Sequence, residues 1–385
     1  MSEDWRNGGF GLYIHWPFCQ AKCPYCDFNS HVSANIDQRR WRDAYLRELD
    51  RYASFTGDRI LQSVFFGGGT PSLMDPDTVA AIIDRIRRNW RTSNDLEITL
   101  EANPTSVEAS RFAGYHAAGV NRVSLGLQAL NDADLKALGR LHSVEEGRTA
   151  FEIARKQFDR VSFDLIYSRQ SQTPGAWRSE LTEALAMAAD HLSLYQLTIE
   201  PGTAFGDRYS RGRLRGLPSE DAAADMYEIT QDLCGTAGLP AYEVSNHAAE
   251  GAESRHNLIY WHYGDYIGIG PGAHGRVTRN GERHAVEAAR QPGAWLTSVE
   301  RDATAETWSR LAEQEQAQEY LLMGMRVNDG VDLARYEAIF GAAPPLEAIA
   351  ELSEMGFVET DMGRLRTTPK GRPLLNAILG RLLAH

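Results

Sequence analysis

Between residues 11 and 200, short β-rich runs alternate with longer helical patterns, and this alternation limits the possible folds more than any other feature of the chain. A strand, a helix and a second strand form a βαβ unit, in which the two strands lie parallel. Six such strands suit an open (β/α)6 barrel, although a doubly wound sheet gives the same pattern along the chain. We therefore predict an α/β fold and favour the barrel. The expected strands are Leu12–His15, Val64–Phe66, Glu97–Leu100, Arg122–Leu127, Val161–Ile166 and Leu192–Leu197, and the expected helices are Ile36–Ser54, Pro76–Asn89, Val107–Ala118, Val144–Lys156 and Gly175–Ala188.

The rest of the chain is expected to form two further parts, so that the predicted domains are 1–200, 201–300 and 301–385. The middle part is rich in Gly, His and Tyr, and we interpret it as a loop-rich linking region. The last part shows the helical patterns Ala312–Arg326, Leu333–Phe340 and Pro345–Glu354, followed by a short hairpin and a final helix opened by Pro369. This order predicts a small winged-helix-like α+β domain. Its weak charge favours a packing role over DNA binding.

Composition excludes several function classes. The net charge of −12 argues against a general nucleic-acid-binding surface, because such a surface needs excess Lys and Arg. No apolar run is long enough for a transmembrane helix, and the start of the chain lacks the basic and apolar regions of a secretory signal. We expect a cytoplasmic protein, with transient membrane contact and oligomeric state left open.

Three of the four cysteines, Cys19, Cys23 and Cys26, fall within eight residues in the spacing CxxxCxxC. In a reducing compartment such a cluster indicates a metal site before it indicates disulfides. Three thiolates without a fourth leave one iron of a four-iron cluster unligated. The alternative is zinc, with His15 or His31 as the fourth ligand. The remaining cysteine, Cys234, is predicted to be a buried apolar residue.

Glycine and polar residues cluster where the predicted strands end. Gly67, Gly68 and Gly69 follow the second strand, Glu101 ends the third, and Gln128 follows the fourth. Ligands of parallel α/β folds bind at the carboxyl ends of strands. Glycines there let the backbone approach a ligand closely. The sequence therefore predicts that these residues share one site with the cysteines.

With these segments in view, the chain resembles the radical-SAM family, and within it the coproporphyrinogen-oxidase-like branch. The segments that carry the resemblance occur in family order and are the cysteine triad, Gly67-Gly68-Gly69-Thr70-Pro71, Glu101-Ala-Asn-Pro104, Ser124-Leu-Gly-Leu-Gln128 and Phe163-Asp164-Leu-Ile-Tyr167. The resemblance implies a [4Fe–4S] cluster on Cys19, Cys23 and Cys26, with S-adenosylmethionine (SAM) bound at the iron that they leave open.

The resemblance also implies roles for individual residues. Tyr13, Tyr25, Gly68 and Glu101 would line the cluster-bound SAM, and Gly69, Thr70, Gln128, Arg140 and Asp164 match positions that hold a second SAM in the porphyrinogen oxidases. Gln128 and Asp164 could instead be simple strand caps, and Arg140, in a helical stretch, an ordinary surface charge. The chain departs from the branch at Ser168-Arg169-Gln170-Ser171, where relatives tend to have Gly and Pro.

Two function classes follow from the resemblance. One is an oxygen-independent coproporphyrinogen III oxidase, which decarboxylates propionates by radical chemistry. The other is a HemW-type haem chaperone, which delivers haem to an acceptor such as a respiratory haem protein. The oxidase has a further cysteine where this chain has Phe28, and a longer N-terminal arm. We therefore predict the chaperone, without oxidase activity, and keep the oxidase as the alternative. Another radical-SAM enzyme is the third candidate.

The segment Arg255-His256-Asn257-Leu258-Ile259-Tyr260-Trp261 matches a His-Asn-x-x-Tyr-Trp motif that is associated with haem in the chaperone branch. A neutral imidazole is a common axial ligand of haem iron, so His256 is the predicted ligand. Tyr260 and Trp261 offer flat apolar surface to a porphyrin. A structural histidine in an aromatic core is the alternative, and His247, His262 and His274 are other candidate ligands. The glycine-dense stretch that follows, residues 266–275, is expected to form a tight turn.

Overall fold

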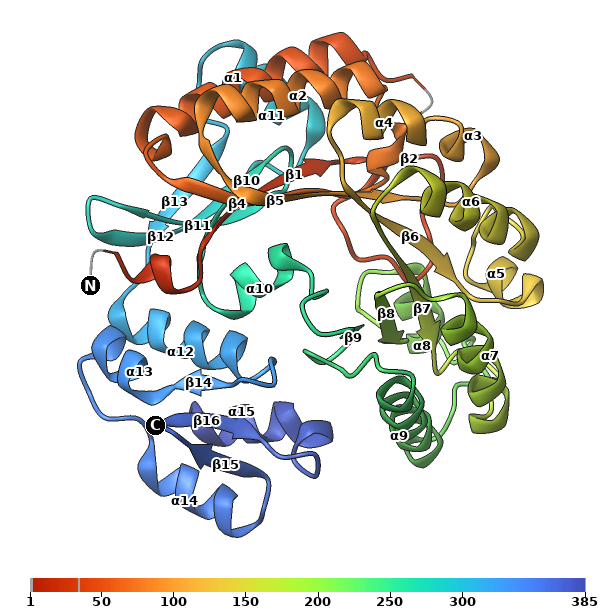
Figure 1. Ribbon diagram of the computed structural model, residues 1–385, viewed down its shortest axis with the longest axis vertical. Coiled ribbons are helices and arrows are strands. Elements are labelled where there is room, and N and C mark those ends of the chain that lie inside the picture. Colours follow the sequence, from red (N-terminus) through yellow and green to blue (C-terminus); the bar gives the residue numbers. More distant parts are fainter. Residues whose placement is uncertain (1–2, 34, 385) are drawn as a thin grey trace.

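The computed structural model describes residues 3–33 and 35–384, and its main feature is one curved sheet of eleven strands in the order β13-β12-β11-β10-β1-β4-β5-β6-β7-β8-β9. The strands from β10 to β8 run parallel. Helices cover the convex side of the sheet (Figure 1). The parallel strands are β1 (Phe10–Trp16), β4 (Ile60–Gly68), β5 (Arg91–Ala102), β6 (Arg122–Gln128), β7 (Arg160–Tyr167), β8 (His191–Gln196) and β10 (Asp265–Ile269).

The strand order decides between the two folds that the sequence left open. From β1 to β8 each new strand adds to the same side of the sheet, and each crossover helix lies on the outer face, as in a barrel. A doubly wound sheet would reverse direction and carry helices on both faces. The sheet ends at β13 and β9, so the barrel is open. The covering helices are α1 (Gln38–Thr56), α2 (Pro76–Asn89), α3 (Ser106–Ala109), α4 (Phe112–Ala118), α5 (Asp132–Ala137), α6 (Val144–Gln157) and α7 (Pro174–Met187).

Local signals explain where these helices begin and end. Pro76 occupies the first turn of α2, and Ser143 and Glu146 form a reciprocal capping box at the start of α6. Gly119 ends α4 in the left-handed conformation at φ +107°. The single helix expected over 107–118 is instead two, α3 and α4. The break follows from Glu108 and Arg111, whose side chains both turn back to the segment Ser72–Met74.

The expectation of a loop-rich segment over 201–300 is wrong. This segment contains helices, and its strands extend the main sheet at both edges. Strand β10 pairs with β1 in parallel, on the side opposite to β4. The glycine-dense stretch is therefore mostly strand, and only Gly270 and Gly272 form a turn, both at positive φ. Its elements are α8 (Ala204–Ser210), α9 (Glu220–Thr236), β9 (Asn246–Ala248), α10 (Arg255–Trp261), β11 (His274–Arg279), β12 (Glu282–Ala288) and α11 (Pro292–Glu300), followed by β13 (Glu306–Arg310).

Helix α10 is exceptional because it lies on the concave side of the sheet, between the sheet and the C-terminal helices (Figure 1). It packs against β4, β1 and β10. The predicted haem motif occupies this helix, so the fold places the motif inside the barrel rather than on its outer surface.

The C-terminal part forms a second hydrophobic core around Tyr320, Met325 and Leu365, separate from the core of the barrel. It is the small α+β domain that the sequence predicts. Arg335 connects it to the barrel through an ion pair with Asp4 at 2.8 Å. The last helix begins at Leu375, not at Pro369, after a 3-10 turn at 372–374. The elements are α12 (Glu313–Gly324), β14 (Val331–Asp332), α13 (Leu333–Phe340), α14 (Leu346–Glu354), β15 (Val358–Asp361), β16 (Arg364–Thr367) and α15 (Leu375–Leu382).

A short pair of parallel strands, β2 (Phe18–Cys19) and β3 (His31–Val32), brackets the cysteine segment. Among the helices that the structure describes, none has the length and apolar character needed to cross a bilayer.

A buried ion-pair group attaches β10 to its neighbours, and it yields a test of the fold. Asp265 is fully buried and accepts from Arg59 at 2.7 Å and Arg283 at 3.1 Å. Asp265→Ala leaves two buried guanidinium groups unpaired, so we expect a loss of about 3–5 kcal/mol in the free energy of unfolding. Glu183→Ala, which removes the exposed partner of Arg148 from within α7, should cost less than about 1 kcal/mol. Urea unfolding of both variants checks this, and equal losses would contradict it.

Candidate functional site

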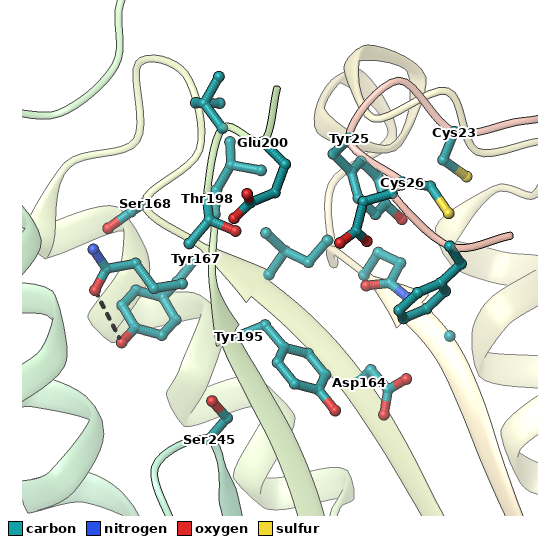
Figure 2. Close-up of a pocket in the computed structure, with 18 of the residues that line it drawn as sticks. Cys23, Tyr25, Cys26, Asp164, Tyr167, Ser168, Tyr195, Thr198, Glu200 and Ser245 are labelled. Atoms are coloured by element: carbon teal, nitrogen blue, oxygen red, sulfur yellow. Dashed lines mark hydrogen bonds between the residues drawn. The ribbon is translucent and has the colours of Figure 1, made fainter. Parts of the chain in front are cut away.

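A cavity of about 1110 Å³ opens at the carboxyl ends of β4 to β8. Figure 2 shows Cys23, Tyr25 and Cys26 on one side, Tyr167 and Ser168 on the other, and Tyr195 and Asp164 between them. The cavity brings together most of the residues predicted for the cluster and SAM. Those that line it are Cys19, Cys23, Tyr25, Cys26, Gly68, Gly69, Thr70, Glu101, Gln128, Arg140 and Asp164.

The three cysteines face this cavity from one loop. Thr70 donates to the Cys19 sulfur at 3.5 Å and Arg140 donates to the Cys23 sulfur at 3.4 Å. Burial raises the pKa of the Cys19 and Cys26 thiols. A raised pKa favours the neutral thiol, so the positive charge of bound iron would be needed to hold these residues as thiolates. Three thiols and two polar donors around one cavity fit a [4Fe–4S] cluster with one open iron.

The structure does not support the zinc alternative, because neither candidate histidine lines the cavity with the cysteines and each is hydrogen-bonded elsewhere. The two ring nitrogens of His15 lie 3.1 Å from the Tyr13 hydroxyl and 3.0 Å from the Asn29 carbonyl. Nε2 of His31 lies 3.3 Å from the Asn29 side chain. Within residues 3–33 and 35–384, no three His, Cys, Asp or Glu side chains converge on a position for a single metal ion.

The glycine loop packs directly on the backbone that precedes Cys19. Gly69 donates to the Trp16 carbonyl at 2.7 Å, and Thr70 donates to the Phe18 carbonyl at 2.8 Å. A Cβ atom at Gly69 would lie 2.6 Å from that Phe18 oxygen, and Gly68 has φ +110°. Only glycine fits both positions without displacing the backbone. The loop thus sets the position of Cys19 and one wall of the cavity.

Two carboxyl groups share the floor of the cavity. Burial, and then the neighbouring Asp164 carboxylate, raise the pKa of Glu101 to about 8. Burial also raises the pKa of Asp164 to about 6, against the effect of hydroxyl donors from Ser193 and Ser124. These groups could accept hydrogen bonds from the amino and ribose hydroxyl groups of SAM, and in their ionised form they would attract its positive charge.

Arg140 is not a surface charge, and it does not lie in a helix. It occupies the loop between α5 and α6 and is nearly buried, with its guanidinium on Cys23, Asn103 and Gly126. Gln128 ends β6 with φ +69°, and its amide lies over Gly126, where a Cβ atom would be only 2.9 Å from Nε2. The hydrogen bonds of Arg140 and the left-handed backbone of Gln128 therefore direct both side chains toward the cavity.

The loop that departs from the family pattern is anchored by a buried arginine. Arg169 pairs with Glu180 at 2.6 Å and Asp134 at 2.8 Å and donates to the Ile166 carbonyl at 2.5 Å. Ser168 and Ser171 adopt positive φ values, of +58° and +62°. The loop thus takes glycine-like conformations without glycine, and ion pairs stabilise it instead.

The residues predicted for haem, and Tyr13, are not among the described residues that line the cavity. His256 is 1% exposed and stacks on Phe65, with ring centroids 4.9 Å apart, and on Tyr13. Its Nδ1 lies 2.8 Å from the Ser63 hydroxyl and its Nε2 lies 2.6 Å from the Tyr260 hydroxyl. Both ring nitrogens therefore have partners. Arg255, at the start of the same motif, pairs with Asp95 at the surface.

The alternative histidines are placed differently. His247 is buried, His262 lies 3.2 Å from Asp329, and His274 is exposed beside Glu287. Sequence reasoning missed several cavity residues. The alternation of β8 could have predicted Tyr195, because Ser193, two residues earlier on the same face, lies beside Asp164. Arg326 and Arg372 come from the C-terminal domain, and only the packing of the two domains places them there.

Comparison with known proteins agrees with this geometry. The radical SAM superfamily matches residues 13–170, and the HemN C-terminal domain matches residues 311–374. The heme chaperone HemW of Bacillus subtilis is 32% identical over 97% of this chain and 99% of its own length. The chain belongs to the HemW family of radical-SAM proteins. A further relative is the bovine radical S-adenosyl methionine domain-containing protein 1, mitochondrial, with 38% identity over 97% of this chain and 87% of that protein.

The fold of the HemW family is shared with an enzyme. The solved structure of coproporphyrinogen III oxidase (HemN) from Escherichia coli superposes with a TM-score of 0.82 at 22% identity, covering 97% of this chain and 90% of the other. Membership of the radical SAM superfamily implies a [4Fe–4S] cluster and SAM, and the cysteines and carboxyls described above fit both. When bound, the cluster supplies the electron that can cleave the sulfonium of SAM.

The cysteine assignment has a direct test. Replacing Cys19, Cys23 or Cys26 by Ser should abolish nearly all iron and sulfide binding after anaerobic reconstitution, because each is predicted to ligate one iron. Cys234→Ala is the matched control, since Cys234 is buried in α9 away from the cavity. Iron analysis and visible absorption measure the outcome. Cluster retention in a triple Ser variant would contradict the assignment.

The raised pKa of Glu101 predicts a pH dependence of stability in cluster-free protein. The folded state holds this proton to about pH 8, whereas the ordinary pKa of a glutamate is 4.5, so the stabilising contribution of the proton is full below pH 4.5 and is lost as pH rises through 8. As the pH rises through this range, Glu101→Gln should lose about 2 kcal/mol less free energy of unfolding than wild type, with solvent screening in the cavity taken into account. Urea unfolding at several pH values measures it, with exposed Glu354→Gln as control. Parallel curves for wild type and Glu101→Gln would contradict it.

Proposed function

We propose that this chain is a haem chaperone, which binds haem, holds a [4Fe–4S] cluster with SAM, and passes the haem to an acceptor haem protein such as a respiratory one. The observation that carries the proposal is the similarity, over nearly the whole of both chains, to a protein named heme chaperone HemW. The likeness to the oxidase HemN, at 22% identity, bears on the fold alone.

Features of the cavity support the proposal. Phe28, at the position where the oxidase is expected to have a further cysteine, lines the cavity with 60% of its surface exposed. Tyr25, Tyr167, Tyr195 and Tyr227 also line it. Aromatic rings pack on the flat apolar face of a porphyrin and keep a polar group at their edge. The volume of about 1110 Å³ is large enough for a ligand of porphyrin size beside SAM.

His256 remains our proposed haem ligand, and ligation requires a local rearrangement. Burial, and then the Arg122 charge, lower the pKa of His256 to about 3, so the ring is neutral at physiological pH, as iron ligation needs. The Tyr260 hydroxyl occupies Nε2 in the closed state. Because His256 does not line the cavity, ligation would require α10 to move together with Tyr260, so that the freed nitrogen reaches the haem.

Haem titration under anaerobic conditions, followed by the absorption of the bound haem, tests this function. We expect His256→Ala to bind haem at least about tenfold more weakly, because an axial bond is lost. Tyr260→Phe should bind no more weakly than wild type, since it frees Nε2. His116→Ala, on the outer face of α4, is the matched control.

Other outcomes would overturn the proposal or part of it. If His256→Ala bound haem as tightly as wild type, the ligand assignment would be wrong. If the reconstituted protein decarboxylated coproporphyrinogen with SAM and a reductant, the oxidase would replace the chaperone. We infer the cytoplasm as the compartment, because the cluster thiols require reducing conditions.

A further inference from the structure

One cation of the cavity has no counter-charge. Arg326 lies just after α12 in the C-terminal domain and lines the cavity. Its Nε atom is buried and has no hydrogen-bond partner. Across residues 3–33 and 35–384, no carboxylate oxygen lies within the 4.0 Å of an ion pair with it, although Glu200, Glu220 and Glu228 line the same cavity. A partly buried guanidinium with unused donors is costly unless a ligand supplies an anion.

A second arginine, Arg372, lies beside Arg326, but its side chain is hydrogen-bonded within the protein. Arg372 also lines the cavity, but it donates to the carbonyls of Met325 and Arg326 and to the Thr367 hydroxyl. It thereby satisfies the last carbonyl groups after α12. Burial lowers the pKa of Arg372, Tyr227 and the Glu243 carboxylate partly offset this effect, and the neighbouring Arg326 charge adds to it. Two like charges therefore meet at one wall, and the N–H groups of Arg326 are the ones left for a ligand.

Arg326 is also connected to the haem motif. Its guanidinium carbon lies 5.0 Å from the ring centroid of Trp261, the last residue of α10. Stacking on an aromatic ring orients a guanidinium while its edge stays open to bidentate hydrogen bonds. The motif that sequence analysis assigned to haem thus contacts the cavity through Arg326, and not through His256.

The position of this cation restricts its ligand. Helix α12 of the C-terminal domain lies on the side of the molecule opposite to β2, which carries Cys19 (Figure 1). Acidic groups occupy the barrel floor at Glu101 and Asp164, and the arginines occupy the wall formed by the C-terminal domain. A ligand that spans the cavity would place its anionic edge on this wall. Haem has two carboxylates side by side on one edge, and the unpaired N–H groups of Arg326 could receive them beside the positive charge of Arg372.

We propose that Arg326, supported by Arg372 and oriented by Trp261, receives the propionate carboxylates of haem, so that the C-terminal domain holds the polar edge of the porphyrin. This inference rests on the proposed haem-binding function and extends it. It assigns the C-terminal domain a part in the binding site, and it predicts that recognition depends on the propionates.

Titration of the reconstituted full chain with haem and with haem dimethyl ester, which lacks the two negative charges, tests the inference. Wild type should bind the ester about tenfold more weakly than haem. Arg326→Gln should weaken haem binding about tenfold and leave ester binding unchanged, and Arg326→Lys should retain part of the preference. Arg381→Gln, an exposed arginine of the same domain paired with Glu351, is the matched control and should behave as wild type.

Each other result counts against the inference. Equal weakening of haem and ester by Arg326→Gln would mean that the residue acts through packing on Trp261. Loss of SAM binding with haem binding intact would assign the arginine to the SAM carboxylate. If Arg326→Gln fails to fold, the ratio of haem affinity to ester affinity in the wild type and in Arg326→Lys still tests whether Arg326 recognises the propionates. Absence of haem binding by wild type would overturn the proposed function itself, whereas an unchanged Arg326→Gln would overturn only this inference.

Discussion

The site depends on one close backbone contact. The loop Gly67–Gly69 packs on the carbonyls of Trp16 and Phe18, at a separation that leaves no room for a Cβ atom on Gly69. This contact joins the end of β4 to the segment that begins the cysteine loop. Cys19 is placed by it, and Thr70 is brought to the Cys19 sulfur. A side chain here would displace both Cys19 and this wall of the cavity.

Charge is divided across the cavity in a way that suits two ligands. Carboxyl groups with raised pKa values lie on the barrel side, beside the thiols, where a cationic sulfonium would be received. Arg326 and Arg372 lie on the side of the C-terminal domain, while Arg140 lies on the barrel side beside Cys23. Helix α10 lies between these parts, with a buried and fully hydrogen-bonded His256 facing the sheet and Trp261 facing Arg326. A small rotation of this helix would change both contacts together.

The sequence predicts the barrel strands well because their signals are local, and it predicts the cysteines as cluster ligands from their spacing. Buried parallel strands form near-continuous apolar runs, which can be recognised in the sequence. The three cysteines and the glycine loop are each short segments, so the spacing of their residues is enough to recognise them. The pairing of β10 with β1 was missed, because it joins residues about 250 positions apart through a strand that contains Gly268. That glycine is needed because a Cβ atom would lie 2.1 Å from the His274 carbonyl. The closed state of His256 and the wall position of Arg326 depend on tertiary packing, which no local pattern encodes.

The central claim is that these three cysteines hold a cluster whose open iron binds SAM within this cavity. Electron–nuclear double resonance on the reduced, reconstituted protein tests it most directly, with SAM isotopically labelled at its amino nitrogen and its carboxylate. We expect hyperfine coupling of both labelled groups to the cluster, and loss of that coupling when Cys23 is replaced. A cluster signal that is identical with and without SAM, and without coupling to either label, would contradict it.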